Sequence, residues 1–362
     1  MHVSSNGINE YICNGFIIQK LKIEMERRVV ITGLGTISPV GNTVAEFWDS
    51  LVQGKSGLNF IQGFDDVDLP VRIVAQVKNF DPMAHGLERA DIRKMDLYCQ
   101  YAIAAANQAV QDSGLVSGEN IEPDRFGVYV GSGIGGISTF VRETNKYTEE
   151  GARRVSPLFV PTMIANIASG NIAIRHNAQG PCLPVVTACA TGTHSVGEAY
   201  HAIKCGMADA IITGGAEAAI HPLAIGGFAN SRALTHAETL EDACTPFDAR
   251  RSGFTMADGA GVLILEEYEH ALQRGATIYA GWLDMETPAT LTTTRHRDPM
   301  AYPPQKPYVW HSMKQDIPLK MCSTSMPTAP AHHSMIRPRP MPSNLHSARK
   351  MHVRHSSVPP SR

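Results

Sequence analysis

The stretch that decides the fold is VVTACATGTHSVGEAYHAIKCG, residues 185–206. It opens with apolar β-branched residues, passes through small residues around Cys189, and continues with apolar and small residues at helical spacing. Together with Leu183 and Pro184 it predicts a buried strand over 183–188, followed directly by a helix over 189–205. This arrangement would place Cys189 in the first turn of that helix.

A thiol at such a position has two interpretations. Unpaired backbone N–H groups and the positive end of the helix dipole favour the thiolate, and the N–H of Cys189 would face an oxyanion formed during acyl transfer. The small residues Ala188 and Ala190 leave room for a thioester to approach. A free cysteine is more often buried and inert, however. The residues alone leave both interpretations open.

Strands and helices alternate on both sides of this stretch. Strands are predicted at VVITGLG (29–35), FGVYV (126–130, leading into GSGIGG), AIITGG (210–215) and GVLILEE (261–267). Helices are predicted over 91–113, over 162–175 and, after the last strand, up to Arg274. A further helix is predicted after Thr43, where Glu46 completes a capping pattern. Its apolar face consists of Phe47, Trp48, Leu51 and Val52. Apolar strands alternating with helices indicate an α/β fold layered around a largely buried sheet.

Several motifs together resemble one known family. TACATG around Cys189 is similar to the active-site motif of the β-ketoacyl-acyl-carrier-protein synthases, the condensing enzymes of fatty acid synthesis. The other matching motifs, in family order, are RRVVITGLGTISPVG (27–41), GSGIGG (131–136), ITGGAE (212–217), GGFANSRALT (226–235), PFDARRSGF (246–254) and DGAGVLILEEYEHALQRGA (258–276). The resemblance runs from Met25 to about Ala280 and is strongest to the elongating type II enzymes.

The resemblance implies a thiolase-like layered α/β fold of two similar halves, with the N-terminal half present here and most of the C-terminal half missing. Cys189 would take an acyl chain from acyl carrier protein, and malonyl-loaded carrier protein would then lose CO2 and attack the thioester. Ile134 and Phe228 match positions that line the acyl-chain pocket, although the residues alone favour ordinary core packing for both. The full fold would be a homodimer that needs no cofactor.

Two groups of residues do not fit a catalytic or metal role. The histidines His176, His194, His201 and His221 do not match the family's catalytic histidines, and we expect them at the surface or in helix packing. Cys205 and Cys244 have no partner at metal-ligand spacing, so no metal site is predicted.

Composition excludes other classes of protein. Hydrophobic residues make up 43% of the 362, enough for a sizeable core, and a net charge of -2 gives no whole-chain argument for nucleic acid. The 7 cysteines form no CxxC pair and read as reduced thiols. No apolar run approaches the roughly 20 residues of a membrane span. We expect a soluble, cytoplasmic protein without nucleic-acid or membrane partners.

The end of the chain has a different composition. Residues 281–362 carry 11 Lys and Arg against 4 Asp and Glu and hold 13 of the 23 prolines, whereas residues 1–280 carry 21 against 30 and hold 30 of the 31 glycines. We expect a synthase domain over 25–283, a disordered extension over 1–24 upstream of the true start at Met25, and a disordered tail over 284–362.

A single frameshift near residues 281–283 explains this tail. The family's later motifs GYGNT, HGTST and SSTKS are missing from the sequence as written. When the last base of each codon is read with the first two of the next, Asp284–Thr293 permits GYGNTGDAYH, Ser325–Ile336 permits NAHGTSTPLND, and Ser357–Arg362 permits SSTKS. The three motifs emerge in order and in one register.

Three functions remain open at this point. The first is a 3-oxoacyl-carrier-protein synthase whose chain as written is inactive. The second is a non-catalytic or polyketide-type subunit, which the presence of Cys189 disfavours for the chain-length kind. The third is a stand-alone cysteine acyltransferase or hydrolase, which would need a histidine base beside Cys189.

Overall fold

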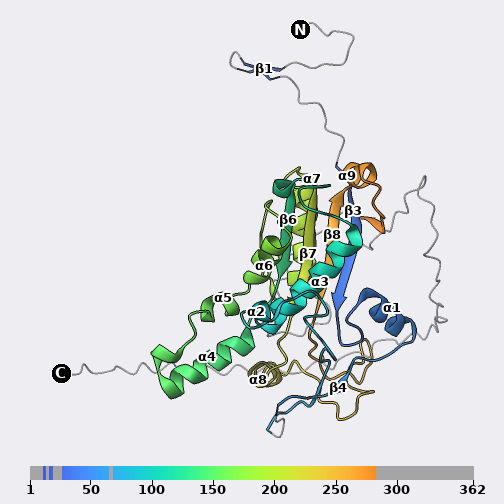
Figure 1. Ribbon diagram of the computed structural model, residues 1–362. Coiled ribbons are helices and arrows are strands. Elements are labelled where there is room, and N and C mark those ends of the chain that lie inside the picture. The colour runs from blue at the N-terminus through green and yellow to red at the C-terminus, as the bar shows by residue number, and fades with distance from the viewer. Residues whose placement is uncertain (1–10, 14–15, 19–26, 65–67, 283–362) are drawn as a thin grey trace, which may run out of the picture. The chain divides into compact units, whose positions relative to one another are not determined.

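A five-stranded mixed sheet forms the centre of the protein (Figure 1). The computed structural model describes residues 11–13, 16–18, 27–64 and 68–282. The strands are β3 (Val29–Ile37), β6 (Phe126–Gly131), β7 (Ala210–Glu217), β8 (Gly259–Glu267) and β9 (Ala280–Trp282), and their order is β6-β7-β8-β3-β9. Only β6 and β7 are parallel, and the other neighbours are antiparallel. The carboxyl ends of β6 and β7 therefore leave the sheet side by side.

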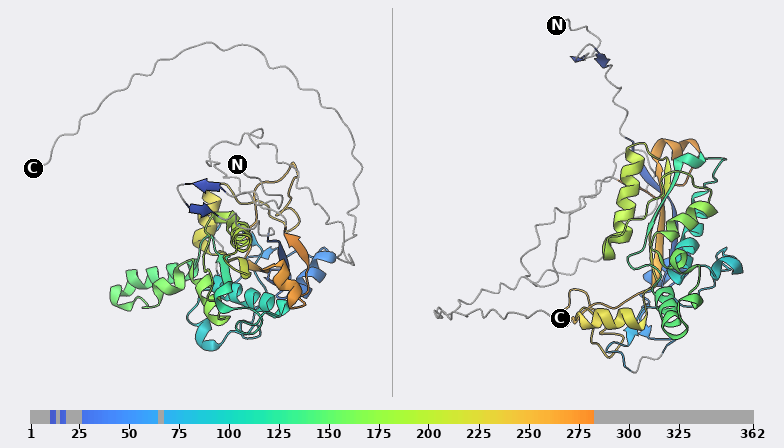
Figure 2. Two further views of the ribbon diagram at one scale, coloured as in Figure 1. Left: turned by 90° about the horizontal axis from the view of Figure 1, so that it is seen from above. Right: turned by 90° about the vertical axis from the view of Figure 1, so that its left-hand side faces the viewer.

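Helices cover both faces of this sheet (Figure 2, right). On one face lie α3 (Leu97–Ser113) and α6 (Ile167–Arg175), and alanines of α3 fill the largest hydrophobic cluster together with β3, β6 and β8. The opposite face is covered by α7 (Thr191–Lys204), which packs Val196, Tyr200 and Ile203 in a second cluster. The stretch quoted first thus supplies the helix of one face.

The remaining elements lie outside the central sheet. They are α1 (Val44–Val52), α2 (Arg89–Ile92), α4 (Ile137–Glu150), α5 (Phe159–Met163), α8 (Pro222–Asn230), α9 (Tyr268–Gln273) and the two-stranded pairs β1 (Tyr11–Cys13) with β2 (Phe16–Ile18) and β4 (Asn59–Phe60) with β5 (Ile73–Val74). A third hydrophobic cluster joins α8 to residues from β5 and its flanks. Short 3-10 turns cover Pro123–Arg125, Ala152–Arg154 and Ala188–Ala190.

The strands at 29–35, 126–130, 210–215 and 261–267 are confirmed, as is the capped helix after Thr43. Thr43 Oγ1 accepts the N–H of Glu46 at 3.2 Å, and the Glu46 carboxylate accepts the N–H of Asn42 at 2.8 Å. The apolar face predicted for this helix is largely uncovered in the described residues, with Trp48 59% and Val52 70% exposed.

Two predicted helices are each divided in the structure. The prediction over 91–113 becomes α2 and α3, because the backbone of Asp96, the residue before α3, is extended. The Asp96 side chain does not cap α3, and its Oδ2 accepts the N–H of Thr139 from α4 at 2.9 Å. The prediction over 162–175 becomes α5 and α6. Here the carbonyl of Met163 accepts the N–H of Gly136 at 2.9 Å instead of continuing a helix.

The predicted buried strand over 183–188 is wrong in two respects. The segment runs beside β6 through one bridge, Val128 to Cys182, and through two backbone hydrogen bonds, so it forms no regular ladder. It is also only partly buried, with Leu183 48% and Val186 53% exposed. The reason is that no second strand among the described residues pairs with its outer edge.

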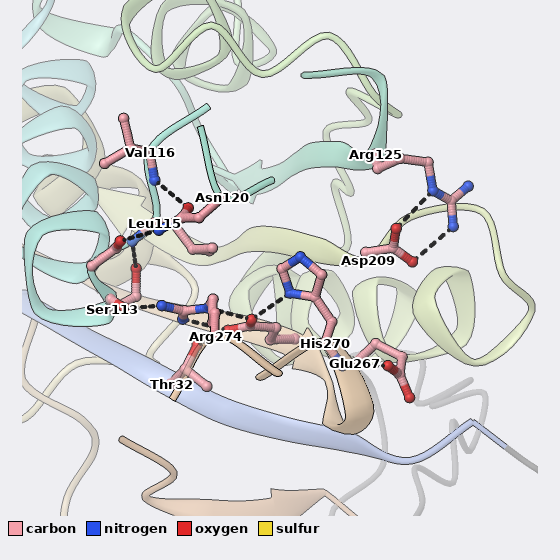
Figure 3. A network of polar contacts seen from close by, with 12 residues as sticks. Thr32, Ser113, Leu115, Val116, Asn120, Arg125, Asp209, Glu267, His270 and Arg274 are labelled. Atoms are coloured by element: carbon pink, nitrogen blue, oxygen red, sulfur yellow. Dashed lines mark hydrogen bonds and ion pairs between the residues drawn. The ribbon is translucent and has the colours of Figure 1, made fainter. Parts of the chain in front are cut away.

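A polar network ties β8 and α9 to the rest of the fold (Figure 3). The fully buried carboxylate of Glu266 accepts from Arg274 Nε at 2.6 Å and from Thr32 Oγ1 on β3 at 2.7 Å, and pairs with His270 Nδ1 at 2.6 Å. Arg274 also donates to the carbonyl of Ser113 at the end of α3, at 2.7 Å. Hydrogen bonds from Arg274, His270 and Thr32 lower the pKa of Glu266 despite its burial.

The predictions about both ends of the chain fall largely outside the described residues. Within 1–24 the structure describes only the antiparallel pair β1 and β2, and the predicted tail over 284–362 is not described. Both stay predictions.

Candidate active site

Cys189 lies in a tight turn between the segment beside β6 and the start of α7. The turn is a 3-10 helix over Ala188–Ala190, and α7 begins at Thr191, so Cys189 precedes the helix instead of lying in its first turn as the sequence predicted. Ala188 adopts φ +52°, the left-handed region, which a non-glycine residue enters at a cost of roughly 1 kcal/mol. The Cys189 side chain is exposed. The Cys189 thiol is therefore accessible, and neighbouring residues must stabilise the unfavourable backbone conformation of Ala188 beside it.

Hydrogen bonds within the turn fix its shape. Thr191 Oγ1 accepts the N–H of Thr187 at 2.9 Å, and the N–H of Ala190 donates to the carbonyl of Thr187 at 3.2 Å. His194, one turn into α7, reaches back with Nδ1 to Thr187 Oγ1 at 2.7 Å. His194 thus supports the turn through a hydrogen bond, a contact that the expected surface or helix-packing position did not include.

Glycines bring the ends of β6 and β7 against this turn. A Cβ at Gly131 would lie 2.3 Å from the carbonyl oxygen of Val185 and 2.4 Å from Thr191 Cγ2. A Cβ at Gly215 would lie 2.9 Å from the Cα of Gly192 in the first turn of α7. Only glycine fits at either position without displacing the backbone near Cys189.

The loop after β6 is held by the carboxylate of Glu217 at the end of β7. Ser132 Oγ donates to Glu217 Oε1 at 2.8 Å, and the N–H groups of Gly133 and Ile134 donate to Oε2 at 2.8 and 3.1 Å. The N–H of Gly135 donates in turn to Ser132 Oγ at 2.8 Å. Burial raises the pKa of Glu217, and these donors offset part of that rise.

A second buried carboxyl group, Asp258, lies at the start of β8. It accepts the N–H of Ile220 at 3.2 Å, and the N–H of Ala219 also donates to it. Burial raises the pKa of Asp258 to about 6, with a smaller contribution from the negative charge of Glu217. The carboxyl groups of Asp258 and Glu217 thus lie near enough to interact electrostatically.

Ile134 and Phe228 occupy different parts of this region. Ile134 lies in the loop held by Glu217 and is 40% exposed. Phe228 lies on α8, packs edge-on to Phe254 at 5.5 Å between ring centroids, and joins the cluster that also contains Ile137, the first residue of α4. The loop that carries Ile134 and the helix α8 that carries Phe228 are therefore linked through Ile137 of α4. The roles of Ile134 and Phe228 in an acyl pocket stay predictions.

The other histidines and thiols have ordinary structural surroundings. His176 hydrogen-bonds Asn107, and burial lowers its pKa to about 4, whereas burial raises the pKa of the Cys99 thiol to about 11. His201 is exposed on α7 and His221 caps the start of α8. Within the described part of the chain, no group of three or more His, Cys, Asp or Glu residues could hold a metal ion.

The structural role of Glu217, and the buried carboxyl group of Asp258 near it, were not predicted from the sequence. Glu217 ends the quoted motif ITGGAE, two residues after Gly215, and Asp258 directly precedes Gly259 in DGAGVLILEE. A charged residue at the end of an apolar strand, next to a glycine-rich loop, is the signal that could have identified them.

The protein is thus an α/β protein with helices on both faces of its sheet. Its thiol site, the cysteine turn before α7, lies at the carboxyl ends of two parallel strands. Residues 26–271 match the family model described as "Beta-ketoacyl synthase, N-terminal domain". The chain belongs to the β-ketoacyl synthase family, and its fold is the thiolase-like α/β fold of that N-terminal domain.

Individual relatives agree with this assignment. The chain is 46% identical over 258 residues to 3-oxoacyl-[acyl-carrier-protein] synthase 2 of Staphylococcus aureus strain COL, covering 71% of this chain and 62% of that protein. It is 47% identical to the enzyme of the same description from Vibrio cholerae serotype O1, covering 70% and 61%. A solved "type II PKS acyl-carrier protein in complex with its ketosynthase bound to the hexaketide" is 33% identical, with a TM-score of 0.63, covering 71% of this chain and 62% of that one. The chain thus spans a little over three fifths of the length of these relatives.

Along the described chain, no helix is both long and apolar enough to cross a membrane.

Proposed function

We propose that this chain carries the acylation half of a cytoplasmic 3-oxoacyl-acyl-carrier-protein synthase, with Cys189 as the nucleophile. The observation that carries the proposal is the exposed Cys189 thiol on a strained turn built against two strand ends. Strain of this kind concentrates at functional sites, where the surrounding structure maintains it.

The reaction has two stages. The Cys189 thiol loses its proton and the thiolate attacks the carbonyl carbon of an acyl thioester. The acyl chain becomes bound to Sγ, and the carrier-protein sulfur leaves as a thiolate that takes up the released proton. Malonyl-carrier protein then loses CO2, and the resulting carbanion attacks the acyl-Cys189 carbonyl, which releases Cys189 as a thiolate and forms a 3-oxoacyl product. The second stage requires donors that polarise the malonyl thioester, and no residue of this chain matches the family's histidines, lysine or phenylalanine for that task.

Ile134 and Phe228 would line the pocket for the acyl chain. The partial exposure of Ile134 beside the cysteine turn supports its role, and the packing of Phe228 near α4 supports a place further along the same wall. Acyl carrier protein would deliver both substrates, and a chain with the complete fold would form a homodimer. Greater identity to the fatty acid synthases than to the polyketide ketosynthase favours a fatty acid substrate.

The nucleophile is tested by limited alkylation with iodoacetamide near neutral pH, followed by mass spectrometry. Cys189 should react faster than Cys99, Cys205 or Cys244, because the thiolate is the reactive species and Cys99 is buried with a raised pKa. Incubation with a decanoyl thioester of N-acetylcysteamine should then acylate Cys189, and Cys189→Ser should abolish this adduct. Equal alkylation of all four thiols in the folded protein would contradict the assignment.

A further inference from the structure

Glu217 has an unusual set of partners for a carboxylate that is largely buried. Within the described chain its bonds come from one hydroxyl and from backbone N–H groups, and no cation pairs with it. Such a carboxylate does not serve as half of an ion pair. Its bonds hold one particular backbone conformation, that of the loop over Ser132–Gly135.

The loop in turn touches the cysteine turn. A Cβ at Gly133 would lie 3.0 Å from Glu217 Oε2 and 3.1 Å from the carbonyl oxygen of Ala188. Ala188 is the residue in the left-handed conformation, and Cys189 follows it directly. Glu217, Gly133 and Ala188 therefore form a continuous stack that ends at the nucleophile.

The same loop carries Ile134, whose N–H is bonded to Glu217 and whose side chain is exposed. A displacement of this loop would move the support of Ala188 and the direction of Ile134 together. Small displacements of groups around a nucleophile reduce rates strongly, because the reacting atoms must approach in a narrow geometry.

We propose that Glu217 is a positioning residue for the acylation of Cys189. It clamps the Ser132–Gly135 loop against Ala188, which fixes the cysteine turn and places Ile134 beside the entering acyl chain. The inference rests on the proposed function in one respect, that an acyl thioester is the reagent of Cys189.

Two substitutions at Glu217 test whether its hydrogen-bond acceptors hold the Ser132–Gly135 loop in place. Glu217→Ala removes every acceptor of the clamp. Glu217→Gln keeps one oxygen for the N–H groups of Gly133 and Ile134, while its amide can donate to Ser132 Oγ, whose hydroxyl can turn. The Gln variant should therefore restore the clamp.

Glu143 offers a matched control on α4. Its carboxylate is also buried, accepts the N–H of Ser156 at 2.9 Å and so holds a different loop, and its other partners are Arg142 and Lys146. None of these partners belongs to the cysteine turn. Glu143→Ala should disturb the fold locally without changing Cys189.

The experiment measures two quantities on the 362-residue chain and its three variants. The first is the rate of Cys189 acylation by the decanoyl N-acetylcysteamine thioester, which should fall roughly ten- to hundredfold in Glu217→Ala and stay within about threefold in Glu217→Gln and Glu143→Ala. The second is amide hydrogen exchange, which should accelerate in Glu217→Ala both at 132–135 and at 187–190.

Each outcome decides one question. Faster exchange at 132–135 without a change at 187–190, or an unchanged acylation rate in Glu217→Ala, would overturn the positioning role. Accelerated exchange at 187–190 with no acylation of any protein, the parent included, would overturn the proposed function and leave the clamp standing. A Glu143→Ala variant that lost acylation to the same extent would show that any loss of a buried carboxylate suffices, and would also overturn the inference.

Discussion

Asp258 is a buried carboxyl group that accepts the backbone N–H groups of Ala219 and Ile220 and interacts with the negative charge of Glu217. Its pKa of about 6 in the folded chain lies above the usual value near 3.9 in an unfolded one. The native state therefore holds the proton more tightly than the unfolded state. The contribution of Asp258 to stability is greatest below pH 4, falls as the pH rises from about 4 to about 6, and stays reduced above that range.

Asp258→Asn should therefore stabilise the protein at pH 7.5. Asparagine keeps an oxygen for the N–H of Ile220 and removes the buried negative charge, so the free energy of unfolding should rise by ~1–3 kcal/mol. Urea unfolding of parent and variant at pH 7.5 and pH 4.5 measures the effect. The gain should shrink at pH 4.5, and a loss of stability at pH 7.5 would show that the carboxylate is needed in its charged form.

His270 shows the same sign of pH dependence as Asp258, but over a higher pH range. Its hydrogen bond to Glu266 raises its pKa, although Arg274 opposes the rise. A histidine with a raised pKa contributes stability that is complete below pH ~6.5 and is lost as the pH rises through the folded-state pKa. His270→Gln should thus cost about 1 kcal/mol more at pH 6 than at pH 9, as a charged hydrogen bond does.

The control for His270 is His201→Gln, at an exposed site on α7 beside Tyr200. This variant should change stability by less than about 0.5 kcal/mol at either pH. Thermal unfolding at the two pH values suffices, and an effect of His270→Gln that does not depend on pH would refute the charged hydrogen bond with Glu266.

At the scale of elements, the sequence predicted those parts whose periodicity is local. The apolar runs 126–130 and 210–215 form strands as predicted, because the helices that bury them lie nearby in the sequence. The divided helices and the irregular segment 183–188 were mispredicted because distant residues decide them, namely Thr139 for the start of α3 and Gly136 for the end of α5. Glu217 was missed for the same reason, since its role depends on the parallel register of β6 and β7.

Two glycine substitutions test how closely the elements approach each other. Gly131→Ala places a methyl group 2.3 Å from the carbonyl oxygen of Val185 and should destabilise the protein by roughly 2–4 kcal/mol, because the backbone beside Cys189 must move. Gly170→Ala, within α6, meets nothing within 4 Å and should stabilise by about 0.5–1 kcal/mol. Denaturant unfolding of both variants measures this, and a neutral Gly131→Ala would show that the approach is looser than the structure has it.

At the scale of the whole molecule, two of the regions in which the described residues leave apolar side chains exposed are α1 and the segment beside β6. Trp48, Leu51 and Val52 are exposed on α1, and Leu183 and Val186 are about half exposed beside β6. Exposed apolar groups of this size mark surfaces that bind something. Nearly two fifths of the length of these relatives lies outside the matched part, and we infer that those residues cover part of this surface.

The 362-residue chain should therefore acylate Cys189 yet form no detectable 3-oxoacyl product from malonyl-carrier protein. An enolate formed without preorganised donors is slower by orders of magnitude, and no residue of this chain matches the family's malonyl-polarising histidines. The uncovered apolar surface should also make the chain aggregate or bind chaperones, which size-exclusion chromatography would show. Restoring the reading frame near residue 283 should recover both condensation and a monodisperse dimer. A purified, monodisperse 362-residue chain that released a 3-oxoacyl product would refute the frameshift account of the tail together with the assignment of the second stage to missing residues.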